Sequence, residues 1–127
     1  MFSSEGRSRL NSELWVQALI RQCQVAGLMA FQVIRGDRER GTILIKVCLM
    51  DGTAYLLQQA TDFEGNRVWR RTPSHMQDNP PSDQNLSEKE IDEKISKERR
   101  YDPDVWVVEI EDPKNLYHHS EKIDKDL

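Results

Sequence analysis

The sequence predicts an α+β domain, in which a mainly antiparallel sheet of about five strands packs on an amino-terminal helix and a second helix precedes the last strand. Three observations predict it. Two segments carry apolar residues at helical spacing, short runs of β-forming residues lie between glycine-containing turns, and 127 residues suffice for one hydrophobic core. We expect a single domain over residues 1–127, with an ordered core at 9–71 and 86–113.

The first helix is predicted over residues 13–26. Ser12 suits an N-cap, proline and glycine are absent from the run, and Gly27 stands where a helix can end in the left-handed conformation. At helical spacing the apolar side chains fall on one face, which we expect to pack on the sheet. This face comprises Trp15, Val16, Leu19, Ile20, Cys23 and Ala26.

Two segments rich in β-forming residues, 30–35 and 42–50, follow this helix. The charged loop between them, 36–41, begins and ends with glycine and suits a connection between antiparallel strands. Asp51 and Gly52 then predict a two-residue type I′ turn, which would pair Cys48 with Tyr55. We expect the more apolar hairpin face to meet the first helix, with Lys46 on the opposite, half-covered face. The apolar face comprises Ile43, Ile45, Val47, Leu49 and Leu56.

The second half of the chain predicts one more helix between two strands. A short strand is expected over 67–71, a mobile loop over 72–85 and a last strand over 105–110. Ser87 and Glu90 form a capping box that starts the helix, and Pro103 disfavours helical geometry at Asp102, so the helix should end before that residue. The apolar stripe of this helix is thin, so we expect it at an edge or end of the sheet. The stripe consists of Ile91, Ile95 and Tyr101.

Residues 114–127 are mostly polar and predict a flexible tail. The net charge of −4 is also uneven along the chain. Up to Arg71 there are ten lysines and arginines against seven carboxylates, whereas from Thr72 onward there are eight against fifteen. An acidic chain argues against bulk affinity for nucleic acid or anionic membranes, because both need a concentrated basic surface. No motif implies a cofactor, so a protein partner or a small ligand remains.

Cys23 and Cys48 stand alone in apolar segments, without CxxC spacing or a histidine at ligand spacing. We expect two buried reduced thiols and no metal site. The first ten residues are polar and lack the apolar stretch of a secretory signal. Together these features predict a cytoplasmic protein.

One group of candidate binding residues surrounds the last strand. Glu109 and Glu111 are two positions apart on a strand and share a face, and such a carboxylate pair can bind a divalent cation. A metal-assisted hydrolase or nuclease-like enzyme that uses residues 102–112 is therefore one alternative, beside the simpler explanation of a solvated strand end. The group comprises Arg99, Arg100, Tyr101, Asp102, Asp104, Trp106, Glu109 and Glu111.

A second group combines an aromatic residue with cations, a composition that stacks bases and holds phosphate. It comprises Arg67, Trp69, Arg70 and Arg71. Nucleic-acid binding through residues 67–71 is a further alternative. A charged sheet edge that resists aggregation explains the same composition.

No catalytic arrangement follows from residue spacing. His75, His118 and His119 are expected to be incidental surface residues, without a nucleophile and acid at matching positions. The element order also occurs in magnesium-dependent nucleases, whose site needs an acid two positions before a lysine. Here Leu44 stands two positions before Lys46, so that site is missing.

The chain resembles a small bacterial family called domain of unknown function 1491. The resemblance rests on RLNSELWVQALIRQCQVAG, on GTILIKV followed by DGTAYL, and most specifically on RRYDPDVWVVEIED. It implies a compact cytoplasmic α+β domain and brings no established activity, ligand or catalytic residue. We therefore favour a non-enzymatic binding or interaction module over an enzyme, with its partner and oligomeric state left open.

Overall fold

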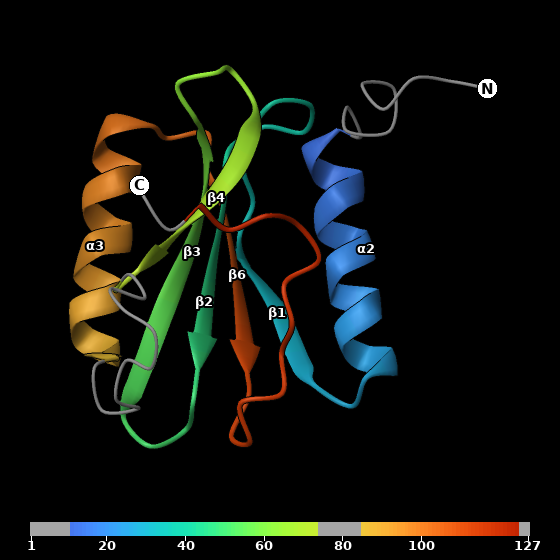
Figure 1. Cartoon of the computed structure of the whole chain (residues 1–127), viewed down its shortest axis with the longest axis vertical. Coiled ribbons are helices and arrows are strands. Elements are labelled where there is room, and N and C mark those ends of the chain that lie inside the picture. The colour runs from blue at the N-terminus through green and yellow to red at the C-terminus, as the bar shows by residue number, and fades with distance from the viewer. Residues whose placement is uncertain (1–10, 74–84, 125–127) are drawn as a thin grey trace.

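The computed structural model describes residues 11–73 and 85–124 as three layers, with a central sheet between two helices (Figure 1). The α+β class is confirmed, with the first helix before the strands and the second before the last strand. The helices are α2 (Ser12–Val25) and α3 (Glu88–Tyr101). The strands are β1 (Met29–Ile34), β2 (Ile43–Cys48), β3 (Thr53–Thr61), β4 (Arg67–Thr72), the short β5 (Leu86–Ser87) and β6 (Trp106–Glu111).

The last strand of the chain lies between the first two strands. The sheet order is β1-β6-β2-β3-β4, with β5 beside β3, and β6 is antiparallel to β1 but parallel to β2. The loop at 36–41 therefore passes the start of β6 and does not join paired strands. A Cβ atom on Gly36 would lie 2.6 Å from Cδ1 of Trp106, and one on Gly41 would lie 2.8 Å away. Glycine permits this close crossing because it has no side chain.

The predicted two-residue turn between β2 and β3 is wrong by one residue. Val47 pairs with Tyr55, and the amide of Leu49 donates to the carbonyl of Thr53 at 3.0 Å. The loop thus contains three residues, of which Met50 and Gly52 both have positive φ. Because side chains alternate along a strand, the shift turns Tyr55 and Leu57 toward α2 and Leu56 away from it.

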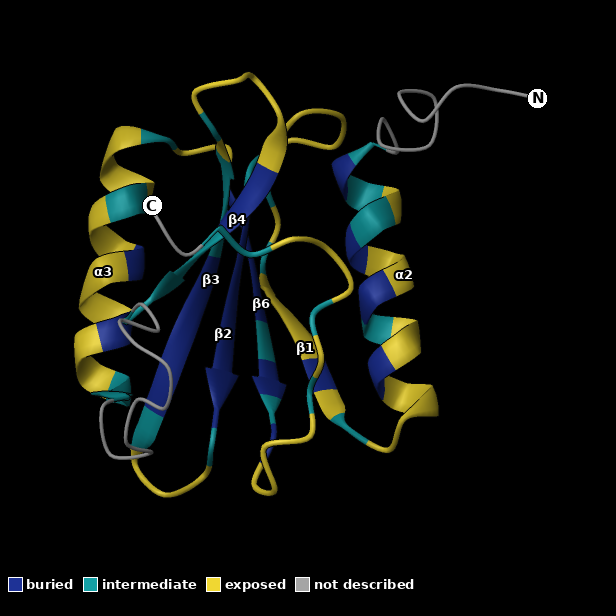
Figure 2. Ribbon diagram, in the orientation of Figure 1, coloured by how far each residue is buried: buried dark blue, intermediate teal, exposed yellow. Residues whose placement is uncertain are grey.

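The sheet has a hydrophobic core on each face (Figure 2). On the α2 side, Val16, Leu19 and Cys23 pack against the sheet, and Ile43, Ile45 and Val47 face them as predicted. On the other side, Ile91 and Ile95 of α3 pack on Leu44, Ala54, Leu56, Val105 and Val107. The prediction that the second helix lies at an edge or end is wrong, since two isoleucines one turn apart suffice to cover this patch of small and medium side chains. Tyr101 does not join them and is 79% exposed.

The helix ends follow local signals with one change. The N-cap of α2 is Asn11 rather than Ser12, and the Asn11 side chain accepts a hydrogen bond from the amide of Leu14 at 2.9 Å. The hydroxyl of Ser12 donates instead to the carbonyl of Gly41 at 2.6 Å. Gly27 has the expected positive φ, and the capping box of Ser87 and Glu90 is confirmed.

The segment after β6 returns across the sheet and covers the outer edge of β4. The amide of Trp69 donates to the carbonyl of Lys122 at 2.9 Å, and the amide of Asp124 donates to the carbonyl of Trp69 at 2.8 Å. Tyr117 and Ile123 pack against the core on the α2 side. These contacts lie within the stretch whose polarity predicted a tail. Most of the predicted loop at 72–85, including His75, lies outside the described residues.

Candidate functional site

The carboxylates predicted around the last strand lie at its two ends. Asp102 caps α3 and accepts a hydrogen bond from the amide of Asp104 at 3.1 Å. Glu109 lies five residues after Asp104, which corresponds to roughly 16 Å at the rise per residue of a strand. In residues 11–73 and 85–124, no three histidine, cysteine or carboxylate side chains are placed to hold a metal ion. The structure therefore does not bring Asp102 and Asp104 together with Glu109 and Glu111.

Glu109 instead contributes to a cluster around Lys46, on the face covered by α3. The Nζ atom of Lys46 lies 2.8 Å from Asp92, 3.3 Å from Glu88 and 3.7 Å from Glu109. Burial alone would lower the pKa of Lys46, but the hydrogen bond to Asp92 and the nearby charges raise it above its ordinary value. The ammonium therefore stays protonated at neutral pH and cannot act as a base.

The two cysteines are buried free thiols, as predicted. Burial and the charge of Glu109 raise the pKa of Cys48 to about 12, and burial also raises the pKa of Cys23. Since the thiolate is the reactive form, neither cysteine is a nucleophile at neutral pH.

The remaining residues of the first group serve the fold or lie in solvent. Arg99 and Arg100 are exposed in the last turn of α3, where positive charge favours the helix dipole. Trp106 is fully buried, and its Nε1 donates to the carbonyl of Asp37 at 2.7 Å. The guanidinium of Arg35 lies 5.3 Å from the centre of its ring. Trp106 is thus a core residue.

The basic and aromatic residues of β4 do not form one surface. Trp69 is fully buried, its ring centre lies 5.2 Å from that of Trp15, and its Nε1 donates to Glu121 at 2.7 Å. Alternation along the strand turns Arg70 to the face opposite Trp69 and Arg71. A buried indole cannot stack on a base, so the nucleic-acid hypothesis lacks its aromatic platform.

Arg71 lines a pocket on the face that α2 covers. Its guanidinium lies 4.1 Å from the ring centre of Tyr55 and donates to the carbonyl of Pro73 and, at 2.9 Å, to Oδ1 of Asn85. Within the described part of the chain, it has no carboxylate at ion-pair distance. The pocket has a volume of about 350 Å³ and is lined by Tyr55, Leu57, Arg71, Asn115, Tyr117, His118, His119 and Ile123.

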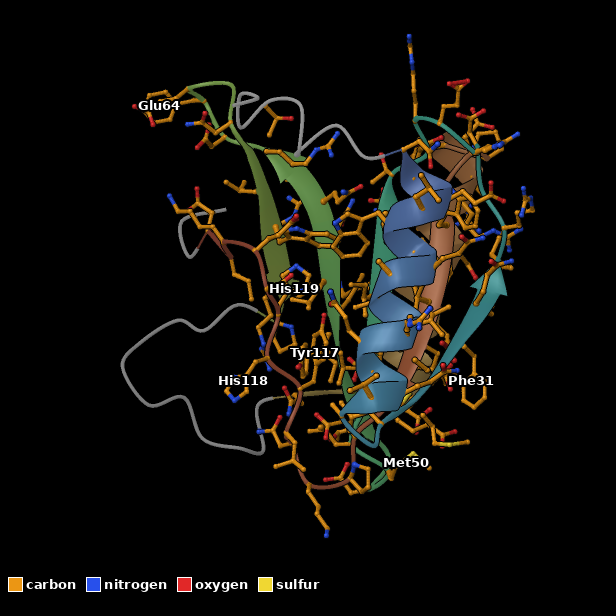
Figure 3. The ribbon with its side chains drawn as sticks, turned by 90° about the vertical axis from the view of Figure 1, so that its right-hand side faces the viewer. Phe31, Met50, Glu64, Tyr117, His118 and His119 are labelled. Carbon is orange, nitrogen blue, oxygen red and sulfur yellow. The ribbon has the colours of Figure 1, made fainter. Side chains whose placement is uncertain are left out.

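The segment after β6 supplies the other wall of this pocket (Figure 3). The hydroxyl of Tyr117 lies 2.8 Å from Nδ1 of His119, and the His119 ring packs edge-on against Trp69 with centres 4.3 Å apart. The Nε2 atom of His119 is buried and has no hydrogen-bond partner among the described residues. The prediction of an incidental surface role for His119 is wrong, because this segment folds back onto the sheet.

Burial shifts the ionisable groups of this pocket toward their neutral forms. It lowers the pKa of His119 to about 4, raises that of Tyr55 to about 12 and raises that of Tyr117 above its ordinary value. It also lowers the pKa of Arg71. At neutral pH the pocket therefore offers one guanidinium, two phenols and the neutral imidazole of His119, with the ring of His118 beside them. Residue spacing predicted Arg71 only, since Tyr55, Tyr117 and His119 come from distant segments that show no shared motif.

Comparisons with known proteins give the family and the fold. A family model described as "Protein of unknown function (DUF1491)" matches residues 10–118. A crystal structure of a DUF1491 family protein from Caulobacter crescentus CB15 is 32% identical, with a TM-score of 0.71, over 91% of this chain and 98% of that one. An NMR structure of a DUF1491 family protein from the same organism is 33% identical, with a TM-score of 0.72. The match covers 91% of this chain and 97% of that one.

A solution structure of a protein from A. tumefaciens is 31% identical, with a TM-score of 0.63, and the match covers 81% of this chain and 86% of that one. No curated protein matches the sequence. Neither of the helices that the structure describes has the length and apolar content needed to cross a bilayer.

Proposed function

The chain belongs to the DUF1491 family of proteins of unknown function, and from this premise we propose that it is a non-enzymatic binding domain whose pocket holds a small anionic ligand. The observation that carries the proposal is the guanidinium of Arg71. It lines a pocket, is partly removed from water, and has no carboxylate partner among residues 11–73 and 85–124.

An anion would supply the negative charge that the described surroundings of Arg71 lack. Removing a cation from water is costly unless an opposite charge and hydrogen bonds compensate it. The ring of Tyr55 and the oxygens of Pro73 and Asn85 compensate only in part, because none of them carries a full negative charge. A guanidinium matches the two oxygens of a carboxylate or phosphate, so either group suits this position.

The other pocket residues support binding rather than catalysis. Tyr55 and Tyr117 keep their hydroxyl protons at neutral pH because burial raises the pKa of both. They can therefore donate hydrogen bonds but not abstract protons. His119 is neutral because burial lowers its pKa to about 4. A volume of about 350 Å³ suits a small ligand.

Substitution of Arg71 tests the proposal. Inorganic phosphate, citrate and benzoate would be titrated into ¹⁵N-labelled protein, and amide shifts followed by NMR. We expect at least one anion to shift resonances of Asn115, Tyr117 and His119 at millimolar concentration, and Arg71→Gln to remove these shifts.

Arg70→Gln is the matched control, because it removes the same charge from the opposite face of the same strand. Its binding should equal that of the unchanged protein, and circular dichroism would verify that both variants fold. If no anion binds, or if the two variants lose binding equally, the pocket is not an anion site.

We also propose a cytoplasmic location. It is supported by Cys23 and Cys48, which are both buried free thiols. Reduced cysteines are usual in a reducing compartment, whereas secreted proteins of this size often pair them.

A further inference from the structure

The two outer edges of the sheet differ in how they are covered. At the β4 edge, residues 122–124 exchange backbone hydrogen bonds with Trp69. At the other edge, β1 pairs with β6 on one side and with no described strand on its other side. Its six residues, MAFQVI, include no charged residue and no proline, two of the devices that keep an edge strand from pairing, although a third device, a bulge, interrupts its far end. The register irregularity between Gln32 and Ile34 leaves Met29–Gln32 as the regular part of this edge.

Apolar side chains stand exposed on this open strand. Met29 is 57%, Phe31 42% and Val33 52% exposed, and Phe31 is visible at this edge in Figure 3. Ala30 and its partner Ile110 belong to the core beneath α2, so alternation places Met29 and Phe31 on the opposite face of the sheet. Met29 also lines a cavity of about 470 Å³ together with Leu28, Met50 and Leu116. The apolar surface therefore continues from the strand around the end of the sheet.

The strand next to this edge carries carboxylates on the same face. Met29 pairs with Glu111 and Phe31 pairs with Glu109. Glu88 and Asp92 of α3 lie further in, and Lys46, whose side chain is only 7% exposed, is the cation among them. Glu111 has no ion-pair partner in the described part of the chain. This face is thus apolar at its edge and acidic one strand further in.

We propose that β1 is a docking edge for an extended basic segment of a partner protein, which adds to the sheet as a further strand. The main chain of the segment would pair with the open side of β1. Its lysine or arginine side chains would lay their aliphatic stems over Met29 and Phe31 and direct their charges to Glu109 and Glu111. Those carboxylates belong to a strand about 10 Å from the added one, within the combined reach of a lysine and a glutamate.

The charges favour this occupant over a second copy of the chain. A second β1 would bring no cation between residues 29 and 34, and it would place a second row of the same carboxylates on the shared face. Arg35, which follows the strand, is already held by Glu13 at 2.7 Å and lies over Trp106. Like charges on a shared face oppose association, whereas a basic segment complements them.

The test uses two synthetic nine-residue peptides, one that alternates lysine with valine and a control with glutamate in place of lysine. Binding to the full chain would be measured by fluorescence anisotropy, and the site located by NMR. We expect the lysine peptide to bind and the glutamate peptide not to bind. The lysine peptide should shift the amide resonances of Met29–Ile34 and slow the hydrogen exchange of these amides. N-methylation of alternate peptide amides should weaken binding, since it removes donors to the edge.

Two protein variants test the electrostatic part. The double variant Glu109→Gln/Glu111→Gln should bind the lysine peptide about fivefold more weakly. The double variant Glu93→Gln/Glu98→Gln removes equal charge from α3 and should bind the peptide as the unchanged protein does. Glu111→Gln alone serves as a second variant, because Glu111 has no ion pair whose loss would disturb the fold. Arg71→Gln should bind the peptide normally, which separates this edge from the anion pocket.

Three results would overturn the proposal: no binding of the lysine peptide, equal binding to both double variants, or shifts confined to residues away from β1. A concentration-dependent dimer of the free protein that shifts the β1 amides would identify a second copy as the occupant instead.

Discussion

Two partly buried cations show how surroundings decide the role of a residue. Lys46 has three carboxylates within 3.7 Å, which hold its proton and balance its charge. Arg71 has an aromatic ring, a carbonyl and an amide oxygen, and no carboxylate in the described part of the chain. Lys46 is therefore a structural residue that joins α3 to the sheet, whereas Arg71 is the cation that we propose binds an anionic ligand.

The burial of His119 should make the stability of the fold depend on pH. Burial lowers its pKa to about 4 in the folded protein, against an ordinary value of 6.5. Between these two values the unfolded chain binds the proton and the folded protein does not, so stability falls as the pH is lowered through this window. We expect a loss of about 2 kcal/mol between pH 7 and pH 4.5 from this residue, measured by urea unfolding.

His119→Gln should remove this part of the pH dependence, because glutamine does not titrate. His118→Gln is the matched control, since His118 is exposed and should leave the dependence as it is. All three proteins contain the same carboxylates, so the difference between the profiles of the two variants reports on His119. Parallel pH profiles for the two variants would contradict the burial of His119.

The loop at 36–41 begins and ends with glycine because it crosses closely over residues 104–106, which are distant in the chain. Its end glycines lie where the chain enters β6, with the carbonyl of Asp104 and the ring of Trp106 against both. The amide of Asp37 donates to the carbonyl of Asp104 at 2.9 Å, and the indole of Trp106 donates to the carbonyl of Asp37. The loop therefore helps to insert the last strand between the first two.

Gly36→Ala tests this crossing. An added methyl group would overlap the backbone at Asp104 and the Trp106 ring, so we expect a loss of about 3 kcal/mol in unfolding free energy. Gly27→Ala provides the comparison, because Gly27 has positive φ but open space around its Cβ position, and should cost about 1 kcal/mol. Equal losses in chemical denaturation would mean that the crossing is looser than described.

At the scale of the whole molecule, the segment after β6 completes the fold on the α2 side. It begins at Asp112, whose buried carboxylate accepts hydrogen bonds from the amides of Leu116 and Tyr117, both at 2.8 Å. It then forms one wall of the Arg71 pocket and pairs with the edge of β4. The same segment thus seals one sheet edge and shapes the candidate site.

Truncation after Pro113 tests this role. We expect the shortened chain to lose about 2–4 kcal/mol of stability and to show red-shifted tryptophan fluorescence, because Trp69 and Trp15 lose apolar cover. Ile123→Ser in the full chain should shift both measurements in the same direction by a smaller amount. If the truncated protein matches the full chain, residues 114–127 are the flexible tail that their polarity predicts.

Local signals in the sequence predicted the elements well. The capping box of Ser87 and Glu90, the glycine after α2 and the β-forming runs each act over a few residues, so they hold whatever surrounds them. The hairpin register was missed because a two-residue and a three-residue loop both accommodate Asp51 and Gly52. The position of β6 was missed because no local signal says which strands a segment joins.

The candidate site shows the same division between local and distant interactions. Arg71 was recognisable as a cation beside an aromatic residue, whereas the structure buries that aromatic residue, Trp69, in the core. Apart from Pro73 and Asn85, the groups that surround Arg71 come from β3 and from the returning segment, more than a dozen residues away on either side. Their assembly depends on backbone pairing and apolar burial across the whole sheet.

Sequence alone established an α+β domain of the DUF1491 family, its two helices and most of its strands, because periodicity, caps and turns are encoded within short windows. The tertiary structure settled the strand order, the register of β3, the face that α3 covers and the union of Arg71 with Tyr117 and His119. These features required three dimensions because each depends on which distant segments bury one another's apolar surface and satisfy one another's backbone.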